Sequence, residues 1–188
     1  VPGEEELAGM GVSYCATCDG AFFKNKVTAV VGGGDVAVED AIFLARLCKK
    51  VYLIHRRDSF RAAKTLVSAL AKYENIELVL DSVVDEIHGE DMVEAVTVHN
   101  VKSGETKKLE VNGVFLAVGT KPNSELFANL VKTADGGWIE ADETCRTSCP
   151  GVYAVGDVRT KQLRQVITAA ADGANAITSI EHYLAEME

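Results

Sequence analysis

Two cysteines near the start of the chain have the spacing of a redox pair. Cys15 and Cys18 enclose two residues in the segment YCATCDG, residues 14–20. Such a pair can close a small disulfide ring and reopen it, and the motif lowers the pKa of one thiol so that a thiolate is available near neutral pH. Asp19 follows directly, as a candidate acid/base for the proton transfers of thiol–disulfide exchange.

Half of a zinc site is the alternative interpretation of this pair. Zinc needs two further ligands. The chain offers Cys145 and Cys149, but at CxxxC spacing and without paired histidines nearby, so we interpret both as loop residues. Cys48, at the end of an expected helix, is predicted to be a small buried apolar residue. An odd cysteine count with one CxxC does not resemble a secreted disulfide framework and favours the reducing cytoplasm.

A second candidate site follows a β-branched run. The strand expected at 27–31 leads directly into GGGDVA, residues 32–37, which opens an expected helix at 35–47. The motif G-x-G-x-x-A allows a tight turn, close approach of a pyrophosphate and close packing of helix on strand. The helix N-terminus adds N–H groups and partial positive charge. A tight turn without a ligand is the alternative. The residues expected to bind a nucleotide are Gly32, Gly34, Asp35, Val36 and Ala37.

The end of the next expected strand, 51–54, indicates which nucleotide binds. It leads into His55, Arg56 and Arg57, and Arg61 is expected one helical turn after Arg57. An NAD site has an acidic residue at this position for the ribose 2′-hydroxyl. Arginine forks instead bind a 2′-phosphate bidentately. This basic cluster therefore favours NADPH, and a solvated basic patch is the alternative.

The elements that must position these residues have an α/β pattern. Strands at 27–31, 51–54 and 76–80 alternate with helices at 35–47 and 59–73, which is typical of a parallel sheet. From 83 to 116 the hydrophobic period becomes about two, which predicts an antiparallel meander with a hairpin turn at 103–105. A break at 119–123 marks a domain boundary. Beyond it we expect a turn at 136–137, a short strand within 151–157 and a long helix at 165–184.

Composition narrows the function classes. A net charge of −9 argues against a nucleic-acid surface, because such a surface needs a basic stripe. No run of apolar residues is long enough for a membrane span. The polar, acidic start of the chain does not resemble a signal peptide.

Four motifs in this order resemble bacterial low-molecular-weight thioredoxin reductase. They are YCATCDG at 14–20, GGGDVA at 32–37, HRRDSFR at 55–61 and GVYAVGD at 151–157. The resemblance implies a disulfide reductase in which electrons pass from NADPH through FAD and the Cys15–Cys18 disulfide to thioredoxin. It implies that Cys18 faces the flavin, that Cys15 attacks thioredoxin and that Asp19 is the acid/base. A full-length member of the family is expected to be a homodimer.

The same resemblance implies a Rossmann-like FAD/NAD(P)-binding fold with a central parallel sheet, a β-meander and an incomplete second domain. Residues 1–122 would be the NADPH-binding domain that carries the CxxC pair, and residues 123–188 the C-terminal part of a split FAD-binding domain. The implied flavin-binding residues are Gly156, Asp157, Val158, Arg164, Gln165 and Val166.

One departure from the family affects these expectations. Its members have an N-terminal unit with a further G-x-G-x-x-G motif that binds the ADP part of FAD, and no such motif precedes Val1. We therefore expect a fragment that binds FAD weakly or not at all, with an apolar face of helix 165–184 left with little to bury against. A nucleotide-binding module without complete catalysis, and a reductase that serves another carrier such as a peroxiredoxin or a glutaredoxin-like protein, are the alternatives.

Overall fold

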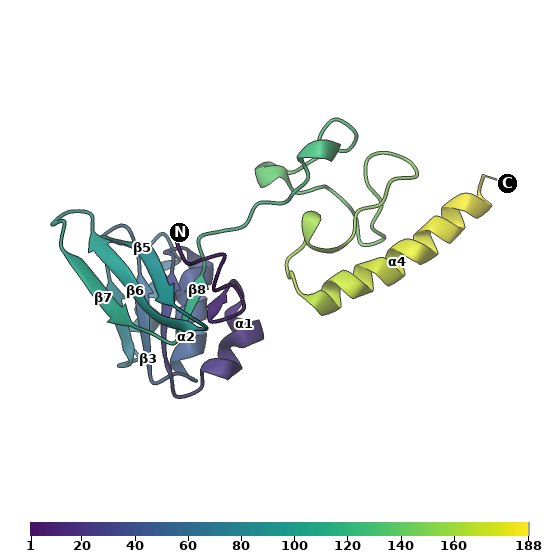
Figure 1. Ribbon diagram of the computed structural model, residues 1–188. Helices are drawn as coiled ribbons and strands as arrows, with labels where there is room; N and C mark the ends of the chain where they lie inside the picture. The colour runs from purple at the N-terminus through teal and green to yellow at the C-terminus, as the bar shows by residue number, and fades with distance from the viewer. Residues whose placement is uncertain (188) are drawn as a thin grey trace. The chain divides into compact units, whose positions relative to one another are not determined.

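The computed structural model describes residues 1–187. The chain divides into two compact units, Val1–Val118 and Gly119–Glu188, and each is described by itself (Figure 1). No helix within the described residues is long and apolar enough to cross a membrane.

A five-stranded parallel sheet forms the centre of the N-terminal unit. Its strands lie in the order β1-β8-β2-β3-β4. Their bounds are Val12–Ser13 (β1), Val27–Val31 (β2), Lys50–Ile54 (β3), Ile76–Val79 (β4) and Gly113–Leu116 (β8). The strands predicted at 27–31, 51–54 and 76–80 are therefore confirmed to within one residue at each end.

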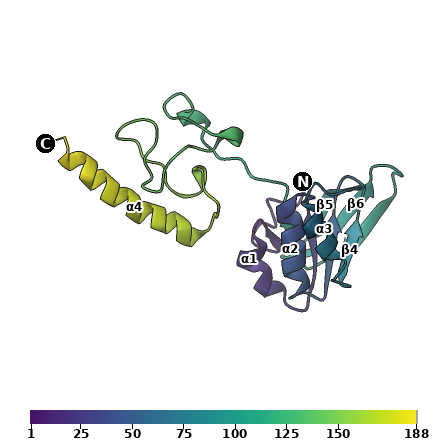
Figure 2. The ribbon, with the colours of Figure 1, turned by 180° about the vertical axis from the view of Figure 1, so that it is seen from behind.

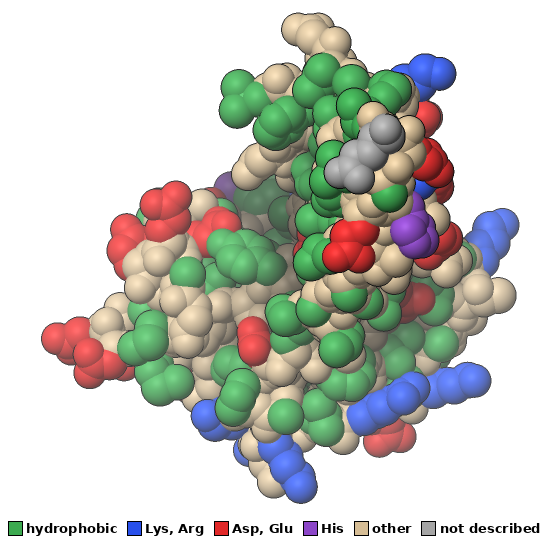
Figure 3. Space-filling view, turned by 90° about the vertical axis from the view of Figure 1, so that its right-hand side faces the viewer, with side chains coloured by type: hydrophobic (Ala, Val, Ile, Leu, Met, Phe, Trp, Pro, Cys, Tyr) green, Lys and Arg blue, Asp and Glu red, His purple; other side chains and the backbone are tan. Residues whose placement is uncertain are grey.

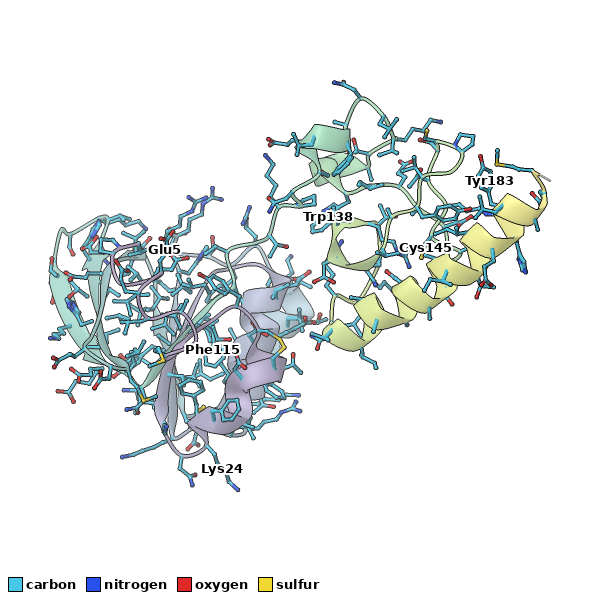
Figure 4. All side chains as sticks on the ribbon, turned by 45° about the vertical axis from the view of Figure 1, so that its right-hand side comes forward. Glu5, Lys24, Phe115, Trp138, Cys145 and Tyr183 are labelled. Atoms are coloured by element: carbon cyan, nitrogen blue, oxygen red, sulfur yellow. A yellow bond between two sulfur atoms is a disulfide. The ribbon has the colours of Figure 1, made fainter. Side chains whose placement is uncertain are left out.

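Helices cover one face of this sheet (Figure 2). They are α1 (Ala16–Asp19), the 3-10 turn η1 (Gly20–Phe23), α2 (Asp35–Ala45) and α3 (Lys64–Leu70). Side chains alternate between the two faces of a strand. Val30, Leu53 and Phe115 accordingly pack with the helices, and Phe115 is labelled inside this unit in Figure 4. Cys48 is buried in the same core, as predicted.

A three-stranded antiparallel sheet packs on the other face. It contains β5 (Ser82–Gly89), β6 (Val93–Asn100) and β7 (Thr106–Glu110), in that order. Val96 and Val98 of β6 share a core with Ala29, Ile54 and Val114 of the parallel sheet. The predicted hairpin turn is confirmed, with Gly104 at φ 74°.

The prediction that the meander extends to residue 116 is wrong. Val114 and Phe115 belong to β8, which runs parallel to β1 and β2. Both residues are almost completely buried, because helices cover one face of the parallel sheet and the meander covers the other. A strand that is buried on both faces has a continuous apolar run. In the sequence, this short run follows the alternating pattern of the meander directly, so the two kinds of strand were not separated.

The helix predicted at 59–73 is also corrected, because only Lys64–Leu70 is helical. The preceding amides have tertiary partners. The Arg61 N–H donates to the Gly33 carbonyl at 2.8 Å, and the Ala63 N–H donates to the Asp35 carboxylate at 2.7 Å. Arg61 is therefore not one helical turn from Arg57; the backbone holds it beside the glycine turn instead.

The C-terminal unit has little regular structure before its last helix. Up to residue 187 it contains three 3-10 turns, η2 (Glu125–Phe127), η3 (Asp135–Gly137) and η4 (Gly156–Val158), and the helix α4 (Val166–Ala185). The predicted turn at 136–137 and the predicted long helix are confirmed. The strand predicted within 151–157 does not form, and Tyr153 makes only an isolated bridge to Arg146. Val131, Ile139 and Ala154 form a small core.

The apolar side of α4 is exposed, as expected from the sequence. Val166, Ile167 and Ile177 are 89%, 75% and 62% exposed. Hydrophobic side chains are visible on the surface of this unit in Figure 3. The buried residues of α4 are Asp172, Ala176 and Ser179, so the helix packs on its own unit mainly through polar and small side chains.

The partly buried carboxyl of Asp40 on α2 makes the stability of the N-terminal unit depend on pH. Burial raises the pKa of its carboxyl from 3.8 to about 6, and the charge of Glu39 acts in the same direction. The stability that protonation contributes is therefore present below pH ~4 and is lost as the pH rises through 6. We expect Asp40→Asn to raise the free energy of unfolding by ~1–2 kcal/mol at pH 7.5, with a smaller gain at pH 4. Denaturant unfolding at both pH values measures this, with Glu74→Gln, which removes an exposed carboxylate elsewhere in the same unit, as the control. An equal gain at both pH values would contradict the argument.

Candidate functional site

Three candidate segments lie at one edge of the parallel sheet. Cys15 follows β1, Gly32 follows β2 and His55 follows β3. Because these strands are parallel, their carboxyl ends share one edge. The chain order reverses at β2, which has β3 on one side and β8 on the other. β1 lies two strands from β2, or about 10 Å at the usual strand spacing. The redox pair and the glycine turn therefore share the edge at which open α/β sheets bind ligands.

The three glycines of the turn are needed for different reasons. A Cβ on Gly32, at φ 155°, would meet the Ala117 carbonyl oxygen and the Ala37 side chain. A Cβ on Gly33 would overlap the imidazole of His55. A Cβ on Gly34 would meet nothing within 4 Å, and the φ of −93° there suits any residue. The fold thus requires Gly32 and Gly33, whereas Gly34 keeps space open at the N-terminus of α2, which fits a bound phosphate group.

The first turn of α2 holds the other predicted phosphate-side residues. Gly34 is the N-cap and Asp35 lies in the first turn, where its carboxylate accepts the Ala63 N–H and thereby caps α3. Val36 is 61% exposed at the helix N-terminus. Ala37 is fully buried against Gly32 and provides the close helix–strand contact that the motif predicts.

The basic cluster divides into one buried ring and three exposed guanidinium groups. His55 is 5% exposed, stacks on Phe60 at 5.4 Å, and its Nε2 lies 3.1 Å from the Ser59 carbonyl oxygen. Burial lowers the pKa of His55, and the charges of the neighbouring arginines act in the same direction. The buried imidazole positions the loop through its contacts with Phe60 and Ser59. The exposed residues Arg56, Arg57 and Arg61 are the ones available to an anion.

Cys15 and Cys18 form a disulfide with a Cα–Cα distance of 5.3 Å. Cys15 is the N-cap of α1, and its Sγ accepts the Cys18 N–H at 3.2 Å. Cys15 is partly buried and Cys18 is exposed. The zinc interpretation has no support, because the two sulfurs bond to each other. Cys145 and Cys149 lie outside helices and strands, as predicted, and residues 1–187 contain no group of three His, Cys, Asp or Glu side chains placed to hold a metal ion.

Ser13 is a further candidate site residue, which the motifs in the sequence did not indicate. Its hydroxyl donates to Asp19 Oδ2 at 2.7 Å and accepts the Cys15 N–H at 3.1 Å. Ser13 is 5% exposed, so these contacts satisfy a buried hydroxyl and fix the carboxylate relative to the disulfide. The signal in the sequence was a polar residue in a short buried strand immediately before the CxxC motif.

In the C-terminal unit, the turn at Gly156–Val158 is attached to α4 by a buried ion cluster. Asp172 accepts the Gly156 N–H at 2.9 Å and two bonds from the Arg159 guanidinium at 2.8 and 2.9 Å. Lys161 Nζ lies 2.8 Å from the same carboxylate. Arg159 in particular holds the pKa of Asp172 well below its usual range. The cluster fixes the turn and leaves the Asp157 side chain exposed.

The remaining predicted flavin residues lie between this turn and the start of α4. The Arg164 guanidinium stacks over Trp138 at 3.6 Å and donates from Nε to the Asp157 carbonyl at 3.3 Å. Gln165 is the N-cap of α4, with its N–H on Thr168 Oγ1 at 3.1 Å, and the next residue, Val166, is exposed. Trp138 is labelled in Figure 4. The predicted flavin residues therefore all lie in the C-terminal unit, and the predicted nucleotide and redox residues all lie in the N-terminal unit.

Comparisons with known proteins agree with a fold that carries a glycine turn and a disulfide pair at one sheet edge. The family model for pyridine nucleotide-disulphide oxidoreductases matches residues 1–173. Thioredoxin reductase of Bacillus subtilis is 44% identical over 100% of this chain and 60% of its own length. The crystal structure of thioredoxin reductase from Streptococcus pyogenes matches with a TM-score of 0.93 and 48% identity, over 99% of this chain and 61% of that one.

The fold is the α/β, Rossmann-like FAD/NAD(P) fold of oxidoreductases, and the chain belongs to the pyridine nucleotide-disulphide oxidoreductase family. Within that family it is a homologue of thioredoxin reductase. The chain spans about 60% of the length of the curated relatives it matches.

The glycine turn yields a paired test. We expect Gly34→Ala to leave the fold stable, because its Cβ enters open space, but to weaken nucleotide binding about tenfold or more by blocking the phosphate. Gly33→Ala should instead lower the free energy of unfolding by ~1–3 kcal/mol, since its Cβ overlaps the His55 ring. Calorimetric titration with a pyridine nucleotide measures the change in affinity, and thermal unfolding measures the change in stability. Unchanged nucleotide affinity in folded Gly34→Ala would show that the open space is not the binding site.

Proposed function

We propose that this chain supplies the NADPH-binding and dithiol part of a thioredoxin-disulfide reductase. Residues 1–122 are the NADPH-binding domain with the CxxC pair, and residues 123–188 are the C-terminal part of a split FAD-binding domain. The observation that carries the proposal is a disulfide and an open glycine turn at the same edge of one parallel sheet. The relatives named thioredoxin reductase support the choice of reaction.

The nucleotide end of the reaction depends on the turn at β2 and the loop after β3. The N-terminus of α2 and the space beside Gly34 receive the pyrophosphate. Arg56, Arg57 and Arg61 are exposed at the carboxyl end of β3, where an adenosine ribose lies in such folds. Their guanidinium forks match the geometry and charge of a 2′-phosphate, which makes NADPH the preferred nucleotide.

The disulfide end depends on Cys15, Cys18 and Asp19. Two electrons open the Cys15–Cys18 bond to a thiolate and a thiol, and Asp19 holds the proton that moves with them. Cys15 then attacks the disulfide of thioredoxin, and Cys18 resolves the mixed disulfide, so that the pair closes again and thioredoxin leaves as a dithiol. Ser13 keeps the Asp19 carboxylate beside the pair throughout.

FAD, when bound, would relay electrons from NADPH to this disulfide. Gly156, Asp157 and Val158 offer a rigid turn, fixed by Asp172, with an exposed carboxylate for hydroxyl groups of the cofactor. The N-terminus of the 20-residue helix α4, with Arg164, Gln165 and Val166, offers positive potential for a reduced flavin. These residues fit FAD but make up only part of a site, so the chain by itself is expected to bind FAD weakly.

The basic cluster predicts a preference that binding measurements can test. We expect Arg56→Ala and Arg61→Ala each to weaken NADPH binding about tenfold, the effect of losing a charge-assisted contact, with little effect on NADH. Lys24→Ala, an exposed cation before β2, is the matched control. Equal losses of affinity for both nucleotides would mean that these arginines do not bind the 2′-phosphate.

The disulfide chemistry can be tested by trapping. We expect Cys18→Ser, reduced and then mixed with oxidised thioredoxin, to accumulate a mixed disulfide through Cys15, because no thiol remains to resolve it. Non-reducing electrophoresis and mass spectrometry detect the adduct, and Cys15→Ser should form less of it. Nucleotide binding without any adduct from either variant would support the alternative of a binding module without catalysis.

A further inference from the structure

The hairpin turn between β6 and β7 reaches the loop that contains the basic cluster. Lys102, in this turn, donates from Nζ to Asp58 Oδ2 at 2.9 Å. Its Nζ also lies 2.9 Å from Asp81 Oδ1, so one cation bridges two carboxylates. Asp58 directly follows Arg57 in the sequence. A residue of the meander thus contacts the segment proposed to recognise the 2′-phosphate.

The turn holds Lys102 in a defined position. Asn100 Oδ1 accepts the N–H groups of Lys102 and Ser103, each at 2.9 Å. The N–H of Val101 donates to the Asp81 carbonyl at 2.6 Å. These bonds fix the hairpin turn against the connection between β4 and β5. The backbone that carries the Lys102 side chain is therefore held in place.

The loop after β3 is attached to the same connection. The Asp81 N–H donates to the Arg57 carbonyl at 3.1 Å, and the Ser82 N–H donates to the His55 carbonyl at 2.9 Å. Two carboxylates therefore lie close to the arginines: Asp58 is in the loop after β3, and Asp81 is hydrogen-bonded to that loop through its backbone. Uncompensated, they would repel a dianionic phosphate and compete with it for the guanidinium groups.

The ion pair between Lys102 and Asp58 remains charged at neutral pH. The hydrogen bond from Lys102 lowers the pKa of Asp58, and the bond to Asp58 raises the pKa of Lys102. Lys102 therefore offsets the negative charge of the loop and holds the Asp58 carboxylate on the side of the meander.

We propose that Lys102 is a specificity-determining residue for the 2′-phosphate of NADPH, acting as a positioning residue through Asp58 and Asp81. The inference rests on the proposed function, because it takes the basic cluster as the 2′-phosphate site. It assigns the meander a part in nucleotide selection: its hairpin turn supplies the cation that neutralises two acidic residues of the arginine loop.

The test measures dissociation constants for NADPH and NADH by calorimetric titration of the whole chain. We expect Lys102→Met to weaken NADPH binding about three- to fivefold, in the range of exposed ion pairs, with little change for NADH. Adding Asp58→Asn to Lys102→Met should restore part of the NADPH affinity, because one of the two uncompensated carboxylates is gone. Lys102→Arg should retain the preference. Lys107→Met, which removes an exposed cation paired with Glu105 in the same hairpin, is the matched control.

The outcomes separate this inference from the proposed function. A native chain that binds both nucleotides equally, or neither, overturns the proposed function and this inference with it. A native chain that prefers NADPH, combined with a Lys102→Met variant that prefers it equally, overturns the inference alone. If Lys102→Met weakens the binding of NADPH and NADH equally, or if Asp58→Asn restores no NADPH affinity, Lys102 only stabilises the loop. Either result also overturns the inference.

Discussion

The close approach of three backbone segments at the carboxyl edge of the parallel sheet is the constraint on which the N-terminal unit depends. Gly32 lies against the Ala117 carbonyl after β8, and Gly33 lies against the His55 ring after β3. Neither contact leaves room for a Cβ. The absence of side chains at these positions brings the ends of β2, β3 and β8 together and leaves Gly34 open above the N-terminus of α2. The same contact helps to bury the His55 ring, and burial lowers the pKa of its imidazole.

Polar contacts then order the loops around this edge. The Asp35 carboxylate caps α3, and the N–H of Arg61 bonds to Gly33, so the segment between His55 and α3 follows the glycine turn and is not helical. On the other side of β8, Ser13 joins Asp19 to the backbone of Cys15. These hydrogen bonds place Arg61 beside the glycine turn and Asp19 beside the Cys15 backbone, at the same sheet edge.

The C-terminal unit depends on charge more than on apolar packing. Its apolar core is small, and Asp172 with Arg159 and Lys161 joins the Gly156 turn to α4. Breaking a buried ion pair leaves an uncompensated charge, so such a cluster specifies one geometry even where it adds little net stability. The exposed side of α4 remains apolar, with Val166, Ile167 and Ile177 in contact with solvent.

The amino-acid sequence by itself determined the element types and the chemistry: β2, α2, β3 and α4, the CxxC pair, and a glycine turn followed by arginines. These features depend on local periodicity and on neighbours in the chain, which the sequence displays directly. Only the tertiary structure decided that β8 joins the parallel sheet, that residues 59–63 are not helical, and that Ser13, Gly33 and Lys102 contact the candidate sites. The physical reason is that their partners are distant in the chain or on another element, so that no local pattern records a hydrogen bond such as that between Lys102 and Asp58.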